Sequence, residues 1–189
     1  EKWELPSVLD EISGIVFLEP GRFACVQDES GTIFVYNTNT AEIENEISFA
    51  GDGDYEGLAI AGESAYVVRS DGKIHEVKNW KSENPKTSIY DTSLTGDHNV
   101  EGLCFDKEGN RLLLAIKGQE PDSKNYKGIY AFNLSTKKLV DEPVFKIDLK
   151  HPVFDGIKEE DIEKIMRPSE IAIHPKTGNV YITDAKNPK

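Results

Sequence analysis

Glu101-Gly102-Leu103-Cys104-Phe105 is the stretch that decides the fold, because its pattern of one polar residue, a glycine and three apolar residues recurs along the chain. The other copies are Ser13-Gly14-Ile15-Val16-Phe17, Glu56-Gly57-Leu58-Ala59-Ile60 and, with glutamate in place of glycine, Ser169-Glu170-Ile171-Ala172-Ile173. The first intervals are 43 and 45 residues, and 69 residues separate Glu101 from Glu170. A period of about 40 to 50 residues is typical of the blades of a β-propeller.

Turn-forming residues divide each repeat into short strands. In the first repeat we expect strands at 12–17, 23–27, 32–36 and 43–49, because Pro, Gly, Ser and Asn cluster between these runs. Four antiparallel strands make one propeller blade. The sequence therefore predicts an all-β fold, a β-propeller with about three and a half four-stranded blades. We expect one domain over residues 1–189, with blades near 12–50, 55–91, 100–149 and 168–184.

An insertion at 150–167 separates the third repeat from the fourth. Its residues Ile157, Ile162, Ile165 and Met166 have nearly helical spacing, Asp155 could cap the N-terminus, and Pro168 would end the run. We expect one short inserted helix there, packed over a face of the blades.

The fourth repeat contains only two expected strands before the sequence ends. A propeller protects its sheet edges by closing its ring. We therefore expect a propeller that is incomplete at the C-terminus, in which further blades would complete the ring. The segment Trp3-Glu4-Leu5 could supply the outer strand of the last blade.

Composition narrows the classes of partner. The 189 residues carry 22 basic and 34 acidic side chains, which gives a net charge of −12 and argues against nucleic acid as a partner. No apolar run is long enough to span a bilayer. Cys25 and Cys104 lie in apolar runs, which indicates small buried side chains.

The hairpin that opens each repeat predicts a site at one mouth of the channel. Paired residues in a hairpin are symmetric about its turn. This symmetry predicts that a polar residue opening the first strand faces a charged residue ending the second. The expected pairs are Ser13 with Asp28, Glu56 with Arg69, Glu101 with Lys117, and Glu170 with Asp184.

Carboxylates from several blades would then converge, and oxygen-rich clusters of this kind suit calcium. The candidate metal ligands are Glu11, Asp28, Glu56, Glu101, Glu170 and Asp184. The candidate ligand-binding residues at the same mouth are Arg69, Lys117, His98 and Asn99. A structural alternative stays open, in which Glu56 with Arg69 and Glu101 with Lys117 are cross-strand ion pairs that only hold the rim.

The phrases Leu9-Asp10-Glu11-Ile12-Ser13-Gly14-Ile15, Val26-Gln27-Asp28-Glu29, Asp54-Tyr55-Glu56-Gly57-Leu58 and Val100-Glu101-Gly102-Leu103 resemble the SdiA-regulated family of bacterial propellers. The resemblance implies further blades, export to the periplasm or attachment to the membrane as a lipoprotein, and a link to calcium and to propeller phytases. It implies recurring rim positions at Asp28, Glu56, Arg69, Glu101, Lys117 and Asp184. Glu170 departs from the family pattern, which has a small residue followed by glycine.

Two functions follow as expectations. The first is non-catalytic binding of a divalent cation, calcium above all, or of a small anionic or sugar-like ligand at the channel mouth. The alternative is calcium-dependent hydrolysis of a phosphate ester or a lactone, in which His98 or a glutamate would act as the base. No nucleophile, phosphate-loop or zinc motif supports a specific reaction. Docking of a partner protein at the rim stays open as a further alternative, and the sequence does not identify that partner.

Overall fold

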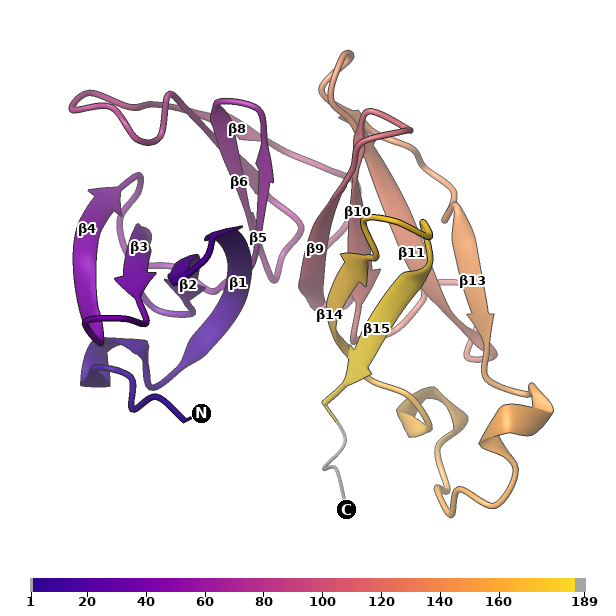
Figure 1. Ribbon diagram of the computed structural model, residues 1–189. Helices are drawn as coiled ribbons and strands as arrows, with labels where there is room; N and C mark the ends of the chain where they lie inside the picture. Colours follow the sequence, from indigo (N-terminus) through magenta and orange to yellow (C-terminus); the bar gives the residue numbers. More distant parts are fainter. Residues whose placement is uncertain (1, 186–189) are drawn as a thin grey trace.

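The computed structural model describes residues 2–185, which form four antiparallel β-sheets arranged side by side in an arc (Figure 1). The predicted fold class, a β-propeller of four-stranded antiparallel blades, is confirmed. The strands of blade 1 are β1 (Ile12–Glu19), β2 (Arg22–Gln27), β3 (Thr32–Asn37) and β4 (Glu42–Ser48). Those of blade 2 are β5 (Tyr55–Ala61), β6 (Ser64–Arg69), β7 (Ile74–Lys78) and β8 (Lys86–Tyr90).

Blade 3 has a divided outer strand. Its strands are β9 (Val100–Asp106), β10 (Arg111–Ile116), β11 (Tyr126–Asn133), β12 (Lys138–Leu139) and β13 (Phe145–Asp148). Both β12 and β13 pair with β11, so together they take the place of one fourth strand. The fourth sheet contains β14 (Pro168–Ile173) and β15 (Val180–Asp184). The described residues contain no helix long and apolar enough to cross a membrane.

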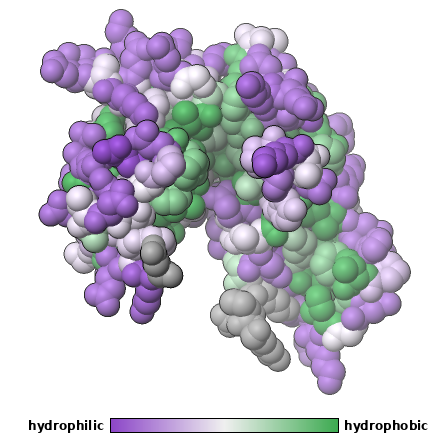
Figure 2. Space-filling model, viewed as in Figure 1, coloured by the Kyte–Doolittle hydropathy of each residue, from purple (hydrophilic) through white to green (hydrophobic). Residues whose placement is uncertain are grey.

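Three apolar layers hold neighbouring blades together. Because alternate side chains of a strand point to opposite faces, a blade between two others buries both faces. Val26 and Ile33 of blade 1 pack with Leu58 and Val67 of blade 2, and similar clusters join blade 2 to blade 3 and blade 3 to the fourth sheet. Figure 2 shows a mostly hydrophilic outer surface, with hydrophobic residues along the hollow between the first and fourth sheets.

The inner strands β1, β5, β9 and β14 lie next to one another in that order. Glycine permits this close approach. A Cβ atom added to Gly57 would lie 2.7 Å from Cβ of Leu103 and 2.9 Å from the carbonyl oxygen of Glu101. A Cβ atom on Gly102 would lie 2.8 Å from the backbone nitrogen of Ile171. The glycines of the repeated motif are therefore packing residues.

The insertion differs from the expected helix over Ile157–Met166. It contains two single 3₁₀ turns, η2 (Pro152–Phe154) and η3 (Ile162–Lys164). Asp155 ends the first turn by donating its backbone N–H to Pro152, so it is not the N-cap of a helix. Gly156 follows with a φ of 89°, which is outside the helical region. Short helices are marginal without an apolar face to bury, and no residue of either turn is buried.

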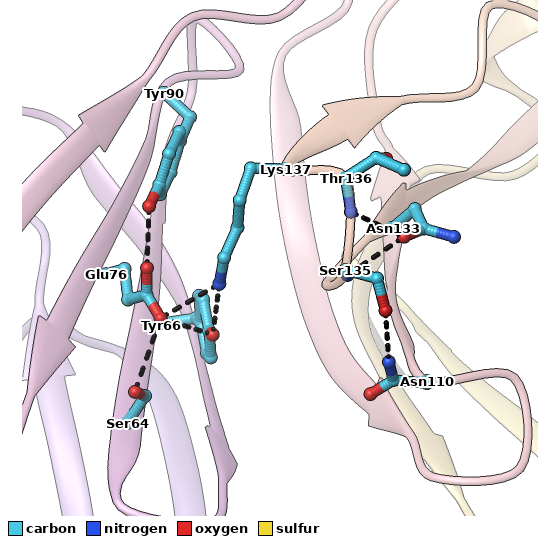
Figure 3. A network of polar contacts seen from close by, with 9 residues as sticks. All are labelled: Ser64, Tyr66, Glu76, Tyr90, Asn110, Asn133, Ser135, Thr136 and Lys137. Atoms are coloured by element: carbon cyan, nitrogen blue, oxygen red, sulfur yellow. Dashed lines mark hydrogen bonds and ion pairs between the residues drawn. The ribbon is translucent and has the colours of Figure 1, made fainter.

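A polar clasp joins the outer parts of blades 2 and 3 (Figure 3). Lys137, in the turn between β11 and β12, extends to Glu76 of β7, which is only 2% exposed. The Glu76 carboxylate also accepts hydrogen bonds from Tyr66 and Tyr90, each 2.7 Å long. The clasp therefore satisfies a buried charge with a cation from the neighbouring blade.

Candidate functional site

A groove of about 550 Å³ runs along the first residues of the four inner strands. Five of the six candidate metal ligands line it: Glu11, Asp28, Glu56, Glu101 and Glu170. Ser13 and Ser169 also line the groove, together with Leu5, Ile12, Gly14 and Ile15. The structure therefore gathers carboxylates from all four sheets, although it does not include Asp184 among them.

A β-bulge at the start of each inner strand sets the direction of these side chains. The pairing register shifts at Ser13, Glu56, Glu101 and Ser169, which are the equivalent residues of the four repeats. A bulge leaves one residue outside the ladder and redirects its side chain. The predicted hairpins are correct, and the predicted contact of Glu101 with Lys117 is present as an ion pair of 2.8 Å. The bulges change other partners, and Asp184 lies opposite Pro168 instead of Glu170. Arg69, for example, lies opposite Tyr55.

Glu101 is the most constrained carboxylate of the groove. Its side chain is 10% exposed, and its Oε1 accepts hydrogen bonds from Nζ of Lys117 at 2.8 Å and from Nδ2 of Asn99 at 3.1 Å. Lys117 directly follows β10, and its backbone N–H donates to the carbonyl of Asn99. The backbone of the hairpin thus holds both donors beside Glu101.

Glu56 forms its side-chain hydrogen bond with another carboxyl group, that of Asp54, instead of with a cation. Burial raises the pKa of its carboxyl group to about 8, and repulsion by Glu101 and Asp54 adds to the shift, while Lys117 opposes it. The cation that lowers the pKa of Glu56 is Lys117 from blade 3. Arg69, from the same hairpin as Glu56, instead binds Asp71 at 3.0 Å. Glu56 therefore holds a proton at neutral pH in the absence of another cation.

Glu170 occupies the motif position at which the other three repeats have glycine. Its Oε1 accepts hydrogen bonds from the backbone N–H groups of Ile171 at 2.8 Å and Leu103 at 3.3 Å. Burial nevertheless raises its pKa to about 7, even though these hydrogen bonds lower it. The glutamate thus turns toward blade 3 and joins the fourth sheet to β9.

Asp28 supplies an unsatisfied acceptor. Its Oδ1 is buried and has no hydrogen-bond partner. A buried carboxylate oxygen without a donor is unfavourable. This oxygen, at the wall of an acidic groove, has the character of a cation ligand.

Asp184, Arg69 and His98 are not among the residues that line the groove. Asp184 accepts a hydrogen bond from the backbone N–H of Arg167. Arg69 pairs with Asp71, and His98 lines a different cavity. Sequence reasoning considered Ser13 but did not include Ser169, although the repeat aligns these two serines. Their equivalent positions in the repeat indicate that both serines belong to the groove.

Metal coordination has one clear limit in this arrangement. Over residues 2–185, no three His, Cys, Asp or Glu side chains come together closely enough to hold a metal ion by themselves. A calcium ion in the groove would therefore also need backbone carbonyl, hydroxyl or water oxygens, all of which are common calcium ligands.

Comparison with solved structures supports the fold. The chain is similar to a chain of the nidogen/laminin complex, with 15% identity and a TM-score of 0.61 over 92% of this chain and 57% of that one. It is also similar to virginiamycin B lyase from Staphylococcus aureus, with 11% identity and a TM-score of 0.58 over 97% and 52%. It is similar as well to the computationally designed Ika4 protein, with 11% identity and a TM-score of 0.52 over 97% of both chains.

The chain thus spans about half the length of the first two structures it matches. No family model matches the sequence, and no curated protein is similar to it at a significant level. At these identities the similarity shows the β-propeller fold alone.

Proposed function

We propose that this chain belongs to a non-catalytic propeller that binds a divalent cation, calcium in particular, in the acidic groove of its inner strands. One observation carries the proposal: five carboxylates line the groove, and none of the described residues lining it is basic. Lys117 is the neighbouring cation, and it is already bound to Glu101. The acidic lining favours a cation over the anionic ligand considered above.

The residues present have suitable chemistry for calcium. Asp28 offers an unsatisfied buried oxygen, and Glu56 and Glu101 add carboxylates from the next two blades. Calcium takes six to eight oxygen ligands, which include carbonyls and water. Because Glu56 and Glu170 have pKa values of about 8 and 7, a bound cation would displace protons from them. Calcium affinity should therefore rise between pH 6 and pH 9.

The proposal is limited to binding: His98, the histidine considered as a base, lies in another cavity, and the glutamates of the groove are assigned to the cation. We also propose that the chain belongs to the SdiA-regulated family and is exported, either to the periplasm or as a lipoprotein. The basis for both is the set of phrases that resemble this family. Extracellular calcium modules have dissociation constants of roughly 10⁻⁴ to 10⁻³ M. We expect the same range here.

Thermal unfolding of chelator-treated protein tests the proposal. Calcium at about one hundred times its dissociation constant should stabilise the folded state by about 2.7 kcal/mol, and magnesium should have a smaller effect. Glu56→Gln with Glu101→Gln should abolish the calcium-dependent shift. The matched control, Glu46→Gln with Glu83→Gln, removes two exposed carboxylates outside the groove and should retain the shift. Equal midpoints with and without calcium would refute the proposal.

A further inference from the structure

A second cavity, of about 320 Å³, lies apart from the acidic groove. Its walls come from the connection between β8 and β9, the loop between β10 and β11, strand β11, and the segment between β12 and β13. The polar and aromatic side chains that line it are His98, Glu120, Asp122, Tyr126, Tyr130, Asp141 and Glu142, together with Ser93. No lysine or arginine is among the described residues lining it.

Glu120 brings a buried negative charge to this cavity. The residue is only 6% exposed. Its Oε1 accepts a hydrogen bond from the backbone N–H of Gly128, and its Oε2 accepts one from the hydroxyl of Tyr130 at 2.8 Å. The ammonium of nearby Lys127 donates instead to the carbonyls of Lys117 and Gly118. Glu120 therefore has neutral hydrogen-bond donors and no contacting cation within the described chain.

Beside the cavity, an ammonium group already contacts two of the lining residues. Nζ of Lys146 lies 4.5 Å from the centre of the Tyr126 ring and 3.9 Å from Oε2 of Glu142. An aromatic face and a carboxylate are together a favourable environment for an ammonium group. Asp122 and Asp141 add exposed carboxylates to the same rim. An acidic rim beside an aromatic face favours an organic cation.

His98 adds a hydrogen-bond donor of a different kind. The residue is 6% exposed, and its Nδ1 accepts a hydrogen bond from the backbone N–H of Thr95 at 3.0 Å. Because a backbone N–H can only donate, the ring proton lies on Nε2. Nε2 has no hydrogen-bond partner within residues 2–185. A ligand in this cavity would therefore offer an oxygen acceptor to His98 as well as donors to the carboxylates.

We propose that this cavity binds a small hydroxylated ammonium compound, of the size of an amino sugar. The ammonium group contacts the carboxylates, and a hydroxyl oxygen accepts the hydrogen bond from Nε2 of His98. The volume is at the lower end for ligand pockets. A metal ion does not meet the same requirements, because it cannot accept the hydrogen bond that Nε2 of His98 offers.

Isothermal titration with glucosamine tests the inference, with glucose and calcium chloride as comparison ligands. We expect saturable binding of one glucosamine, at least tenfold weaker binding of glucose, and no competition by calcium. Glu56→Gln with Glu101→Gln should leave glucosamine binding unchanged, which separates this site from the acidic groove. Absence of saturable binding, or equal affinity for glucose, would overturn the proposal.

Two variants near the rim of the cavity should change glucosamine affinity in opposite directions. Asp122→Asn with Glu142→Gln should weaken glucosamine binding at least tenfold, whereas Glu46→Gln with Glu83→Gln should change it less than twofold. Lys146→Met should strengthen binding severalfold, because it removes a competing ammonium group from Tyr126 and Glu142. A gain in affinity cannot come from misfolding of the variant, so this result would test the site itself. A loss of affinity in Lys146→Met, or an equal loss in the control, would contradict the assigned site.

Discussion

The ammonium group of Lys137 lies 2.9 Å from the carboxylate of Glu76, although the two residues are 61 positions apart and belong to different blades. Burial raises the pKa of Glu76, but hydrogen bonds from Lys137, Tyr90 and Tyr66 outweigh it and bring the pKa to about 2. The Lys137 ammonium also lies 5.0 Å from the centre of the Tyr66 ring. This contact adds a polar link between blades 2 and 3 to the apolar layer that they share.

Removal of Lys137 should destabilise the protein strongly. Lys137→Met leaves the Glu76 charge buried without its cation, and breaking a buried pair in this way costs about 3 kcal/mol. Adding Glu76→Gln should recover part of the loss, because the uncompensated charge is then absent. Lys138→Met is the matched control, since the neighbouring Lys138 is exposed. Urea unfolding of the four proteins measures the effect, and similar losses for Lys137→Met and Lys138→Met would show that the clasp contributes little.

Close packing of the inner strands predicts a penalty for Gly57→Ala. The added Cβ would lie 2.7 Å from Cβ of Leu103, so blades 2 and 3 would have to separate slightly. Overpacking of this kind costs about 1 to 3 kcal/mol. Gly51→Ala should be within about 0.5 kcal/mol of the parent protein, because nothing lies within 4 Å of the added Cβ. Thermal unfolding distinguishes the two, and an unchanged midpoint for Gly57→Ala would contradict the packing argument.

The high pKa of Glu56 predicts that stability falls as pH rises. The folded protein retains this proton up to about pH 8, whereas an unfolded chain loses it near pH 4.5, so the contribution is complete below that pH and is lost through pH 8. Solvent screening at this partly exposed group limits the effect to on the order of 1 to 2 kcal/mol. Glu56→Gln should reduce the decline between pH 5.5 and pH 9 and should be the more stable protein at pH 9. Glu46→Gln is the control, and a parallel pH profile for Glu56→Gln would reject the explanation.

The two thiols should react slowly in the folded protein. Burial raises the pKa of Cys25 and of Cys104 to about 12, so little thiolate is present at neutral pH. We expect labelling by a thiol-specific disulfide reagent at pH 8 to be at least tenfold slower in buffer than in 6 M guanidinium chloride. Rapid labelling of both thiols in buffer would show that the packing around β2 and β9 opens readily.

The sequence by itself determined the blades and the acidic character of their inner strands. Strand pairing within a blade joins residues that are close in the chain, so turn residues and alternating apolar positions define it locally. The same repeat placed Glu56 and Glu101 at equivalent positions, which is why both could be expected in one groove. The insertion was less predictable. The spacing of Ile157 and Ile162 is compatible with a helix, but it does not reveal whether an apolar surface is available to cover that helix.

The hairpin of blade 3 already predicted the contact of Glu101 with Lys117, but only the tertiary structure decided which other charges meet. A bulge of one residue at Glu56 leaves Tyr55 opposite Arg69, and Lys117 of the next blade becomes the influential cation. The same applies to Lys137 with Glu76, and to His98, which belongs to a cavity of its own. The physical reason is that contacts between blades depend on how successive sheets rotate and pack. That packing is set by close approaches such as Gly57 against Leu103, rather than by spacing along the chain.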